Sequence, residues 1–283
     1  MRMADLAPAE IDAVLDLAAE LKSAPRDDYG RRLPGRTLGL LLRQSSTRTR
    51  VSLEVAISQL GGTAIQLPPS ELQLARGEAL GDTARVLARY LDAIAVRTEA
   101  HEELAEIEAH SSVPVLNALT NEEHPLQALA DLLTIRERFG GLEGVRVGWV
   151  GDGSNVCASL ASACGLMGAE FTCATPHGYE PVGVPVVHDP REAASEAHVL
   201  VTDVWTSMSH NGNGDRACDL APFTLDESLL AIADPDAIVL HCLPAHPGEE
   251  ISPGLLYGPR SAVWDEAENR LHTAKALLAL LLA

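Results

Sequence analysis

Lysine is almost absent from this chain. Among 283 residues only Lys22 and Lys275 are lysines, arginine supplies the other basic side chains, and the formal net charge is -19. Nonspecific binding to a nucleic acid requires a continuous basic surface, and the sequence contains no such stretch. Nucleic acid is therefore not an expected partner, and the acidity fits either a high-salt cytoplasm or a biased genome.

Paired cysteines and long apolar segments are missing as well. The cysteines are odd in number and form no CxxC pair: Cys157, Cys164, Cys173, Cys218 and Cys242. Neither a disulfide framework nor a zinc knuckle is predicted, and no metal is expected. The N-terminal stretch MRMADLAPAEIDAVL lacks the apolar core of a signal peptide, and ALLALLLA is too short to span a bilayer. We expect a cytoplasmic protein with no membrane partner.

The composition is otherwise that of a folded protein. Hydrophobic residues make up 46% and charged residues 22%, with no low-complexity tract and no solenoid repeat. A chain of this length is typically divided into roughly two domains.

Short β-rich apolar runs alternate with helical stretches in the first half of the chain. Strands are expected at 36–42, 63–67, 92–97 and 113–119, and helices at 47–60, 82–91, 99–109 and 125–139. This βαβ order predicts a parallel sheet. The glycines of FGGLEG then interrupt the pattern, so the first domain is expected to span residues 1–138.

A second βα series follows that boundary. Strands are expected at 145–150, 170–175, 184–188, 198–204 and 236–242, and a helix at 155–167. A long loop rich in glycine and asparagine is expected over 207–222. The last helix, 265–282, is apolar enough to pack against a domain. The sequence thus predicts an α/β fold of two domains, each a parallel sheet flanked by helices, with the second at 139–265.

Three hydroxyl residues and two arginines meet at a strand-to-helix junction in RQSSTRTR. A helix N-terminus presents unpaired N–H groups and a positive dipole end, and arginine adds bidentate charge. This pattern makes a candidate phosphate cradle of Ser46, Thr47, Arg48 and Thr49. An ordinary Ser/Thr N-cap followed by solvated arginines would give the same pattern.

Two further junctions carry polar groups. In NEEHPLQAL, His124 and Gln127 flank a helix-starting proline, where the imidazole could polarise a carbonyl; a simple helix cap is the alternative. In AIVLHCLPAH, Cys242 ends a buried strand and could be a nucleophile, a polar contact or a small buried hydrophobe. GWVGDGSNV suggests a dinucleotide loop only weakly, because Val156 replaces the third glycine.

Taken in order, SSTRTR, HPLQ, DVWTSM, HCLP and ENRLH resemble the transcarbamoylase family, and within it the ornithine carbamoyltransferases. GEALGDTARVLARYLDAIAVR and GPRSAVWDEAENRLH carry the same resemblance. It implies transfer of the carbamoyl group of carbamoyl phosphate to the side-chain amine of L-ornithine, without a cofactor. The products would be L-citrulline and phosphate, in arginine metabolism.

The resemblance also implies an architecture. One α/β domain would bind carbamoyl phosphate, with the terminal helix 266–283 returning to complete it, and the other would bind the amino acid. The family assembles as trimers or multiples of trimers, so a homo-oligomer is expected. Gln73 would reach the site of a neighbouring subunit.

For carbamoyl phosphate, the resemblance implies a set of residues that binds the phosphate, the carbonyl oxygen and the carbamoyl nitrogen. Thr49, Arg97 and His124 would meet the carbonyl oxygen, where a tetrahedral intermediate concentrates negative charge. Gln127, the backbone at Cys242 and Leu243, and the nearby Arg270 would bind the carbamoyl nitrogen. The full set is Ser46, Thr47, Arg48, Thr49, Gln73, Arg97, His124, Gln127, Cys242, Leu243 and Arg270.

For ornithine, the resemblance implies Asn155, Asp203, Ser207 and Met208. Asp203 would pair with an ammonium group and Asn155 with the carboxylate, while Cys242 and Asp203 flank the attacking amine and influence its pKa. Direct attack by the amine needs no covalent nucleophile. The expected catalytic residues are Arg97, His124, Asp203, Cys242 and Arg270.

Some features depart from the family pattern, and other functions stay open. Ser209 stands where a glycine is usual, and the loop 209–222 is unusually rich in asparagine and glycine. These two departures concern the closing motion of the enzyme and its rate more than the choice of substrate.

Aspartate, putrescine or an acetylated amino acid could replace ornithine as acceptor. A dehydrogenase would need the third glycine and a ribose-binding acid, and an inactive scaffold would have no need of Arg48, His124 or Arg270.

Overall fold

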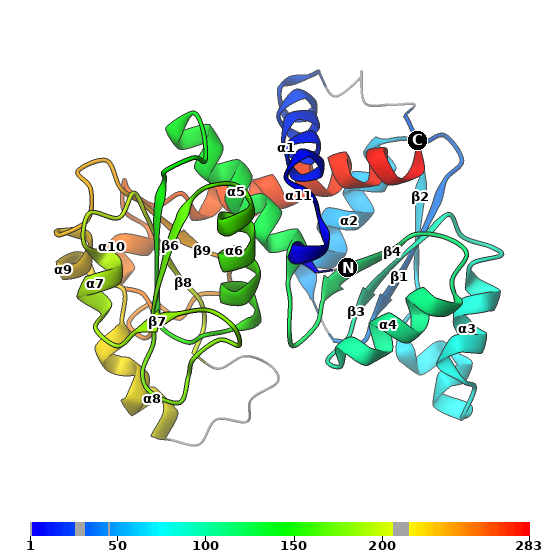
Figure 1. Ribbon diagram of the computed structural model, residues 1–283. Helices are drawn as coiled ribbons and strands as arrows, with labels where there is room; N and C mark the ends of the chain where they lie inside the picture. The colour runs from blue at the N-terminus through cyan, green and yellow to red at the C-terminus, as the bar shows by residue number, and fades with distance from the viewer. Residues whose placement is uncertain (1, 26–31, 45, 206–214) are drawn as a thin grey trace. The chain divides into compact units, whose positions relative to one another are not determined.

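The computed structural model describes residues 2–25, 32–44, 46–205 and 215–283 (Figure 1). The chain divides into two compact units, one made of Met1–Leu126 with Arg270–Ala283 and the other of Gln127–Asn269. Each unit contains one parallel sheet with helices packed against it. The predicted α/β class with two sheets is confirmed.

The first unit contains a four-stranded sheet in the order β2-β1-β3-β4. Its strands are β1 (Thr37–Leu42), β2 (Thr63–Gln66), β3 (Ala93–Arg97) and β4 (Val115–Leu119). All pairings are parallel, and the register places Leu42 beside Arg97 and Arg97 beside Leu119. The carboxyl ends of three strands therefore meet at one edge.

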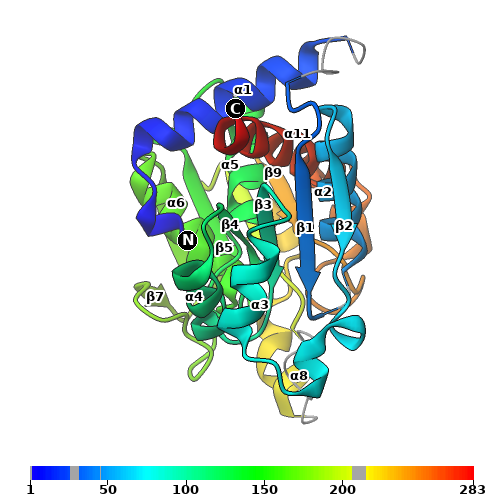
Figure 2. The ribbon, with the colours of Figure 1, turned by 90° about the vertical axis from the view of Figure 1, so that its right-hand side faces the viewer.

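Helices cover both faces of this sheet. They are α1 (Pro8–Ser23), α2 (Thr47–Gln59), α3 (Leu80–Leu87) and α4 (His101–His110), with 3-10 turns η1 (Met3–Asp5), η3 (Pro69–Glu71) and η4 (Gln73–Arg76). Ala84 of α3 and Leu104 of α4 pack with Val96 of β3 in one apolar cluster. Helix α2 lies on the opposite face of the sheet from α3 and α4 (Figure 2).

The second unit contains a five-stranded parallel sheet in the order β7-β6-β5-β8-β9. Its strands are β5 (Arg146–Val150), β6 (Glu170–Ala174), β7 (Val186–Val187), β8 (Val199–Thr202) and β9 (Ile238–His241). Strands β5, β8 and β9 are adjacent although about fifty residues separate the first two in sequence. The segments that follow these three strands are thereby brought together.

The helices of the second unit are α6 (Asn155–Leu166), α7 (Pro190–Ala194), α8 (Asp215–Leu220), η5 (Ala221–Phe223), α9 (Glu227–Leu230) and α10 (Pro253–Leu256). Ala194, Leu229 and Leu255, from α7, α9 and α10, pack with Leu200 and Val239 of the sheet. Helix α6 lies on the other face (Figure 1).

Two long helices pass from one unit to the other along the chain. Helix α5 (Pro125–Phe139) begins in the first unit, and α11 (Val263–Leu282) begins in the second and ends in the first. The predicted return of the C-terminal helix to the first domain is therefore confirmed. Lys275 of α11 is only 1% exposed. Among the described helices, none is long and apolar enough to cross a membrane.

The expectation of an irregular loop over 207–222 is wrong for its second half. Residues 215–223 form α8 and η5, and Leu220 and Phe223 are buried against the second unit. Two buried apolar side chains are enough to hold such a short helical segment in place, although they show no regular period. The part of the predicted loop at 207–214 lies outside the described residues.

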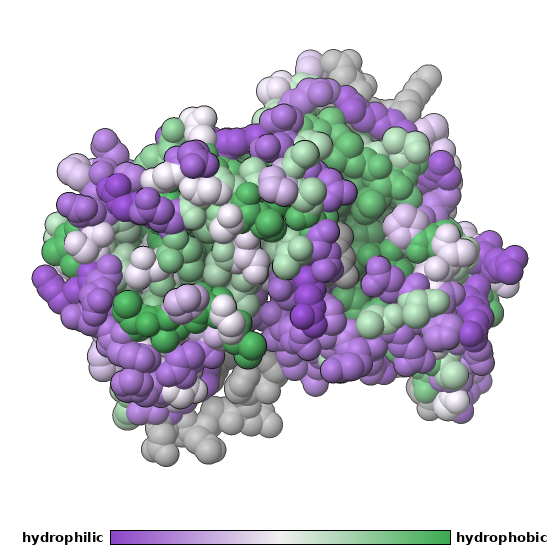
Figure 3. Space-filling view, viewed as in Figure 1, coloured by the Kyte–Doolittle hydropathy of each residue, from purple (hydrophilic) through white to green (hydrophobic). Residues whose placement is uncertain are grey.

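Hydrophobic residues gather on one visible part of the first unit. They lie over α2 and the C-terminal part of α11 (Figure 3). Val51 of α2 and Leu280 and Leu281 in the C-terminal part of α11 are large apolar side chains that are 43%, 47% and 38% exposed.

Candidate active site

Each sheet reverses its strand order at one point of its own. Most of the polar residues predicted for each unit lie near the carboxyl edge of that unit's sheet. In the first sheet the reversal lies between β1 and β3, and in the second between β5 and β8. Loops that leave adjacent strands in opposite directions open a crevice at the carboxyl edge, where α/β proteins bind ligands. Each unit therefore has one group of candidate residues, described separately below.

The predicted phosphate cradle forms the N-terminus of α2. Ser46 is the N-cap, and its Oγ accepts a hydrogen bond from the N–H of Thr49 at 3.3 Å. Thr47 and Arg48 are exposed in the first turn, whereas Thr49 is 1% exposed. The capping that the sequence left as an alternative is thus present. It fixes the first turn, whose remaining N–H groups point out of the helix.

A buried chain of polar groups lies behind the cradle. Arg270, near the middle of α11, is hydrogen-bonded through Nη2 to Thr49 Oγ1 at 3.4 Å and through Nη1 to His124 Nε2 at 3.5 Å. Because a guanidinium only donates, Nε2 accepts, and the imidazole proton is on Nδ1. All three side chains are at most 5% exposed.

His124 is held in its neutral form by this environment. Burial lowers the pKa of His124 well below its usual value, and the positive charges of Arg270, Arg97 and Arg48 lower it further. Three arginines thus act electrostatically on one imidazole. Positive charge gathered in this way favours an anion, and neutral His124 can donate a hydrogen bond without adding charge.

A cavity of about 450 Å³ opens beside the cradle. Ser46, Thr47 and Arg50 line one side of it, and Arg43 and Gln44, just after β1, line another. Arg50 belongs to the quoted motif, but neither it nor Arg43 was among the predicted binding residues. Arg43 and Arg50 flank the cradle closely in the sequence, so their position alone could have predicted them as candidate binding residues.

Gln73 lies apart from this group within the described structure. It begins η4, is exposed, and its Oε1 accepts a hydrogen bond from Arg76 at 3.3 Å. It makes no hydrogen bond with the cradle residues in the part of the chain that is described. The resemblance assigned it to a neighbouring subunit, so this position neither supports nor opposes its predicted role.

In the second unit, Asp203 is the centre of the polar group. It follows β8 and is 6% exposed. Its Oδ1 accepts from the Cys242 thiol at 3.0 Å and from Val204 N–H at 2.7 Å, and its Oδ2 accepts from Ser154 Oγ at 3.0 Å. The three side chains follow β8, β9 and β5, so the sheet order explains why they meet.

Cys242 is a thiol at neutral pH. Burial raises the pKa of Cys242 well above its usual value, and the negative charge of Asp203 raises it further. The thiol is the donor in its bond to Asp203. This geometry is that of a polar contact and not of a thiolate nucleophile, which decides among the alternatives that the sequence left open.

Asn155 occupies the first position of α6, after the N-cap Ser154. The glycines of GWVGDGSNV have a packing role here: a Cβ on Gly153 would lie 2.3 Å from the carbonyl oxygen of Tyr179. The turn is therefore shaped by the neighbouring segment and not by a dinucleotide. Ser207 and Met208, the other predicted ornithine ligands, lie outside the described residues, as does Ser209.

Glu266 was not predicted, and it joins the predicted Gln127 to the backbone of His241. Its Oε1 accepts from Gln127 Nε2 at 2.7 Å, and its Oε2 accepts from the N–H of His241 at 2.8 Å. Gln127 Nε2 also donates to Asp131 at 2.8 Å. Both amide hydrogens of Gln127 are thus engaged with carboxylates. Only the position of Glu266 within WDEAENRLH could have suggested it.

A second buried carboxylate, Glu250, fixes the turn that carries Cys242 and Leu243. His241 Nδ1 accepts from Leu243 N–H at 2.9 Å, and His241 Nε2 donates to Glu250 at 3.1 Å. Burial alone would raise the pKa of Glu250, but the hydrogen bonds from His241 and from the His246 N–H hold it below its usual value. No local sequence signal marks Glu250, because its side-chain partner, His241, lies at the end of β9.

Arg216 was also missed. It lies in α8, forms an ion pair with Asp152, donates to the carbonyl of Trp205, and lies 4.8 Å from the centre of the Tyr179 ring. These contacts tie α8 to the segments after β5, β6 and β8. An isolated arginine in a stretch of expected loop gives no indication of such a role.

Comparison with known proteins gives these groups a context. Residues 1–137 match the family model described as aspartate/ornithine carbamoyltransferase, carbamoyl-P binding domain, and residues 143–281 match its Asp/Orn binding domain. An ornithine carbamoyltransferase of Acidothermus cellulolyticus is 52% identical over 98% of this chain and 94% of its own length. One of Thermosynechococcus vestitus is 49% identical over 100% of this chain and 95% of its own.

Solved structures agree with the sequence matches. The crystal structure of ornithine carbamoyltransferase from Thermus thermophilus superimposes with a TM-score of 0.92 at 46% identity, covering 100% of this chain and 98% of that one. The Pyrococcus furiosus enzyme gives a TM-score of 0.94 at 43% identity, with 99% and 95% covered. The predicted resemblance is confirmed over the whole sequence, and the chain belongs to the aspartate/ornithine carbamoyltransferase family.

Proposed function

We propose that this protein transfers the carbamoyl group of carbamoyl phosphate to the side-chain amine of L-ornithine, giving L-citrulline and phosphate. The observation that carries the proposal is the Ser154–Asp203–Cys242 group, in which a carboxylate and a thiol lie at adjacent strand ends of the domain that matches the Asp/Orn binding model. Relatives close to half identical over nearly their whole length are named ornithine carbamoyltransferases.

The first unit is the proposed carbamoyl-phosphate site. The N–H groups of the first turn of α2, with Ser46, Thr47, Arg48 and Thr49, would hold the phosphate. Arg97, His124 and Thr49 would stabilise the carbonyl oxygen as it becomes an oxyanion. Neutral His124 suits that role because it donates without repelling the surrounding arginines. Arg270 connects Thr49 and His124 and so orients both.

The second unit is the proposed ornithine site. Asp203 attracts the side-chain ammonium, and Asn155, Ser207 and Met208 would bind the rest of the amino acid. The amine attacks only after losing a proton; the C–N bond then forms, the C–O bond to phosphate breaks, and phosphate leaves. Gln127 and the backbone at Cys242 and Leu243 would hold the carbamoyl nitrogen. Catalysis here rests on positioning and charge stabilisation.

We extend the proposal to the domains, the assembly and the location. Residues 1–138 with 266–283 would form the carbamoyl-phosphate domain, and 139–265 the ornithine domain. Oligomers built on trimers, with Gln73 contributed to a neighbouring subunit, are consistent with the exposed apolar Val51, Leu280 and Leu281. A cytoplasmic location is consistent with the five cysteines, which form no disulfide.

Parallel assays test the function. Purified protein receives carbamoyl phosphate with ornithine, aspartate, putrescine or N-acetylornithine, and product is measured for each. Citrulline from ornithine alone is the expected result. Product from another amine would refute the ornithine assignment, and no product from a folded protein would refute carbamoyl transfer.

Variants then test the two groups. Arg48→Gln should raise the KM for carbamoyl phosphate roughly 10- to 100-fold, the effect of losing a charged hydrogen bond, with little change in the KM for ornithine. Arg89→Gln is the control, because it removes the same charge from an exposed position of the same unit that does not line the cavity. Asp203→Asn should instead raise the KM for ornithine. Equal effects of both arginine variants would mean that only general charge matters.

A further inference from the structure

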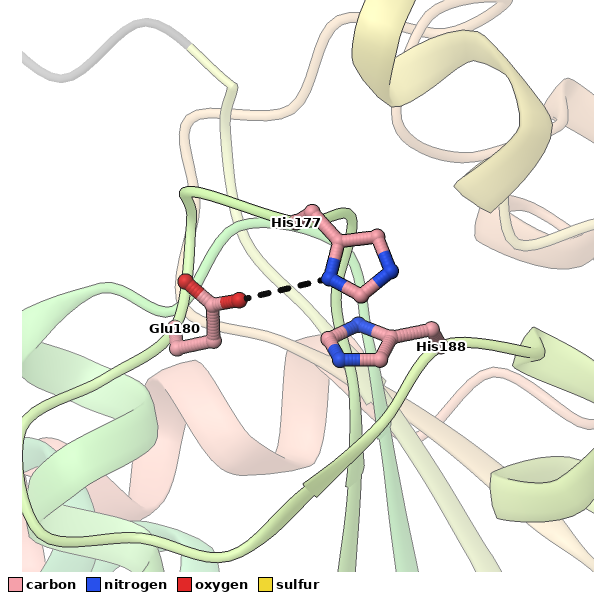
Figure 4. Close-up of side chains that lie close together, drawn as sticks. All are labelled: His177, Glu180 and His188. Carbon is pink, nitrogen blue, oxygen red and sulfur yellow. Dashed lines mark ion pairs between the residues drawn. The ribbon is translucent and has the colours of Figure 1, made fainter.

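Three side chains outside the proposed site form a cluster suited to a metal ion. His177 and Glu180 lie in the turn after β6, and His188 directly follows β7 (Figure 4). One ligand atom from each lies within 4.8 Å of the others. The two imidazole rings face each other with centroids 3.7 Å apart, and His177 Nδ1 lies 3.9 Å from Glu180 Oε1. We propose that His177, Glu180 and His188 bind a zinc ion.

The backbone beneath this cluster is well fixed. Strands β6 and β7 pair in register, Cys173 with Val186 and Ala174 with Val187, and Thr175 N–H continues the ladder to the Val187 carbonyl at 3.1 Å. In the turn, Gly178 has a φ of +87°, and its N–H donates to Glu180 Oε2 at 2.9 Å. The turn thereby places the side chains at positions 177 and 180 on the same side as His188.

His188 already has the orientation of a metal ligand. Its Nδ1 is 2.8 Å from the carbonyl oxygen of Thr175, so Nδ1 carries the proton and Nε2 is left with its lone pair. A backbone carbonyl on the far nitrogen is the usual partner of a metal-bound histidine, because it fixes both tautomer and ring orientation. The Gly178 bond uses Glu180 Oε2, and Oε1 is the oxygen that lies nearer to His177.

The chemistry of the donors selects the metal. Two imidazoles and one carboxylate are the donor set of zinc sites that keep a fourth position for water, whereas magnesium and calcium prefer oxygen donors alone. Zinc–nitrogen bonds of about 2.0–2.1 Å would separate ligand atoms by about 3.3 Å. The exposed side chains of His177 and Glu180 can close the present distances by small rotations.

The other two clusters of potential metal ligands each include a buried side chain that is already hydrogen-bonded. In the group of Asp203, His241 and Cys242, both ring nitrogens of His241 are hydrogen-bonded and the thiol donates to Asp203. In the group of His246, Glu249 and Glu250, the buried Glu250 accepts from the His241 ring through Oε1. Of the three clusters among the described residues, the one at His177 has all three side chains exposed.

Zinc titration tests the site directly. ZnCl2 is added to the purified full-length protein near pH 7.5, without substrates, and binding is followed by calorimetry. We expect one equivalent to bind, and His177→Ala and His188→Ala to weaken that affinity at least tenfold, about the loss that even an outer partner of a metal ligand causes. Magnesium should not compete. Binding should weaken in mild acid, where imidazoles take up protons.

Matched variants separate this site from the others. His246→Ala removes an exposed histidine from another cluster, and Cys242→Ser removes the thiol from the third. Both variants should still bind one equivalent of zinc. Cobalt(II) should give the absorption bands of a tetrahedral site, lost in the His177→Ala/His188→Ala double variant. Circular dichroism checks that each variant is folded. The proposal is overturned if the wild type binds no zinc, or if the double variant binds it as tightly as the wild type.

Discussion

The neutral state of His124 follows from its position among arginines. Three guanidinium groups oppose a fourth positive charge, and burial removes the water that would stabilise it. When a phosphate group enters, it offsets the arginine charges. The imidazole is therefore set by the protein to donate a hydrogen bond and not to act as an acid in the empty site.

The first prediction concerns the acid stability of the protein. Because the folded pKa of His124 is depressed, the unfolded state, with a histidine pKa of about 6.5, takes up a proton that the folded state does not. Stability is therefore lost as pH falls below about 6.5. By pH 5.5 this single group contributes about 1.4 kcal/mol of destabilisation. His124→Gln should lose less stability between pH 7.5 and 5.5 than the wild type.

Urea unfolding at the two pH values measures this difference. Phosphate-free buffer is needed, because bound phosphate would raise the pKa of His124. The carboxylates titrate in both proteins, so their effect cancels in the comparison. Parallel pH dependence in wild type and variant would show that His124 is not the group responsible.

At the scale of elements, Arg216 anchors α8 by charged and polar contacts, beside the buried Leu220. Arg216 pairs with Asp152, which is 8% exposed, and donates to the Trp205 carbonyl, while its guanidinium lies over the Tyr179 ring. Asp152 and Trp205 lie close in sequence to Ser154 and Asp203. A six-residue helix is too short to be stable alone, so these contacts decide where it lies.

Our second prediction is that Arg216→Gln raises the KM for ornithine severalfold more than the KM for carbamoyl phosphate. Removing the guanidinium leaves Asp152 buried without its ion-pair partner, which costs about 3 kcal/mol of stability. Steady-state kinetics with each substrate varied in turn, together with thermal unfolding, measure both effects. Arg191→Gln on α7 is the control, because that arginine is exposed in the same unit. Equal changes in the two KM values would contradict the prediction.

The elements themselves were largely predictable, and their arrangement was not. Apolar runs such as AIAVR and helix starts such as Ser46 are local signals, and the strands and most of the long helices appear where they were expected. Strand order depends on pairing between distant segments. The stretch containing α1 gave no expectation of a helix, and α8 lies where a loop was predicted, because its stability comes from Arg216 and two buried apolar residues.

The candidate site was predictable to the same extent. Residues at junctions and strand ends, such as His124 and Cys242, follow from the rule that parallel sheets bind ligands at their carboxyl edge, whereas Arg97 and Asp203 were assigned through the resemblance. Glu266 and Arg216 act through bonds to groups far away in sequence, and Glu250 acts through the His241 ring at the end of β9, so no local pattern marks them. The assigned roles of Gln73, Ser207 and Met208 rest on the resemblance alone.

For the whole molecule, the dominant property is its charge. A formal net charge of -19 places many carboxylates within reach of one another, and their repulsion disfavours the compact state. Ion pairs such as Arg36–Asp92 are partly exposed, so each contributes little against that repulsion.

The third prediction follows from this imbalance. Raising KCl from 0.05 to 1 M shortens the screening length from about 14 to 3 Å and should raise the Tm by a few degrees, equivalent to about 1 kcal/mol. Thermal unfolding at several salt concentrations at pH 7 provides the measurement. An unchanged or lower Tm would show that the attractive ion pairs balance the net charge, and it would remove the case for a high-salt origin.

The scarcity of lysine has a practical consequence for labelling this protein. Lys275 is buried in α11, and Lys22, near the end of α1, is partly accessible. An amine-reactive dye would therefore attach at one side chain, Lys22, besides the α-amino group. That attachment point lies well away in sequence from the cradle and from Asp203. The chain thus carries a single partly accessible lysine as a handle for a fluorophore or a surface tether, without any engineered cysteine.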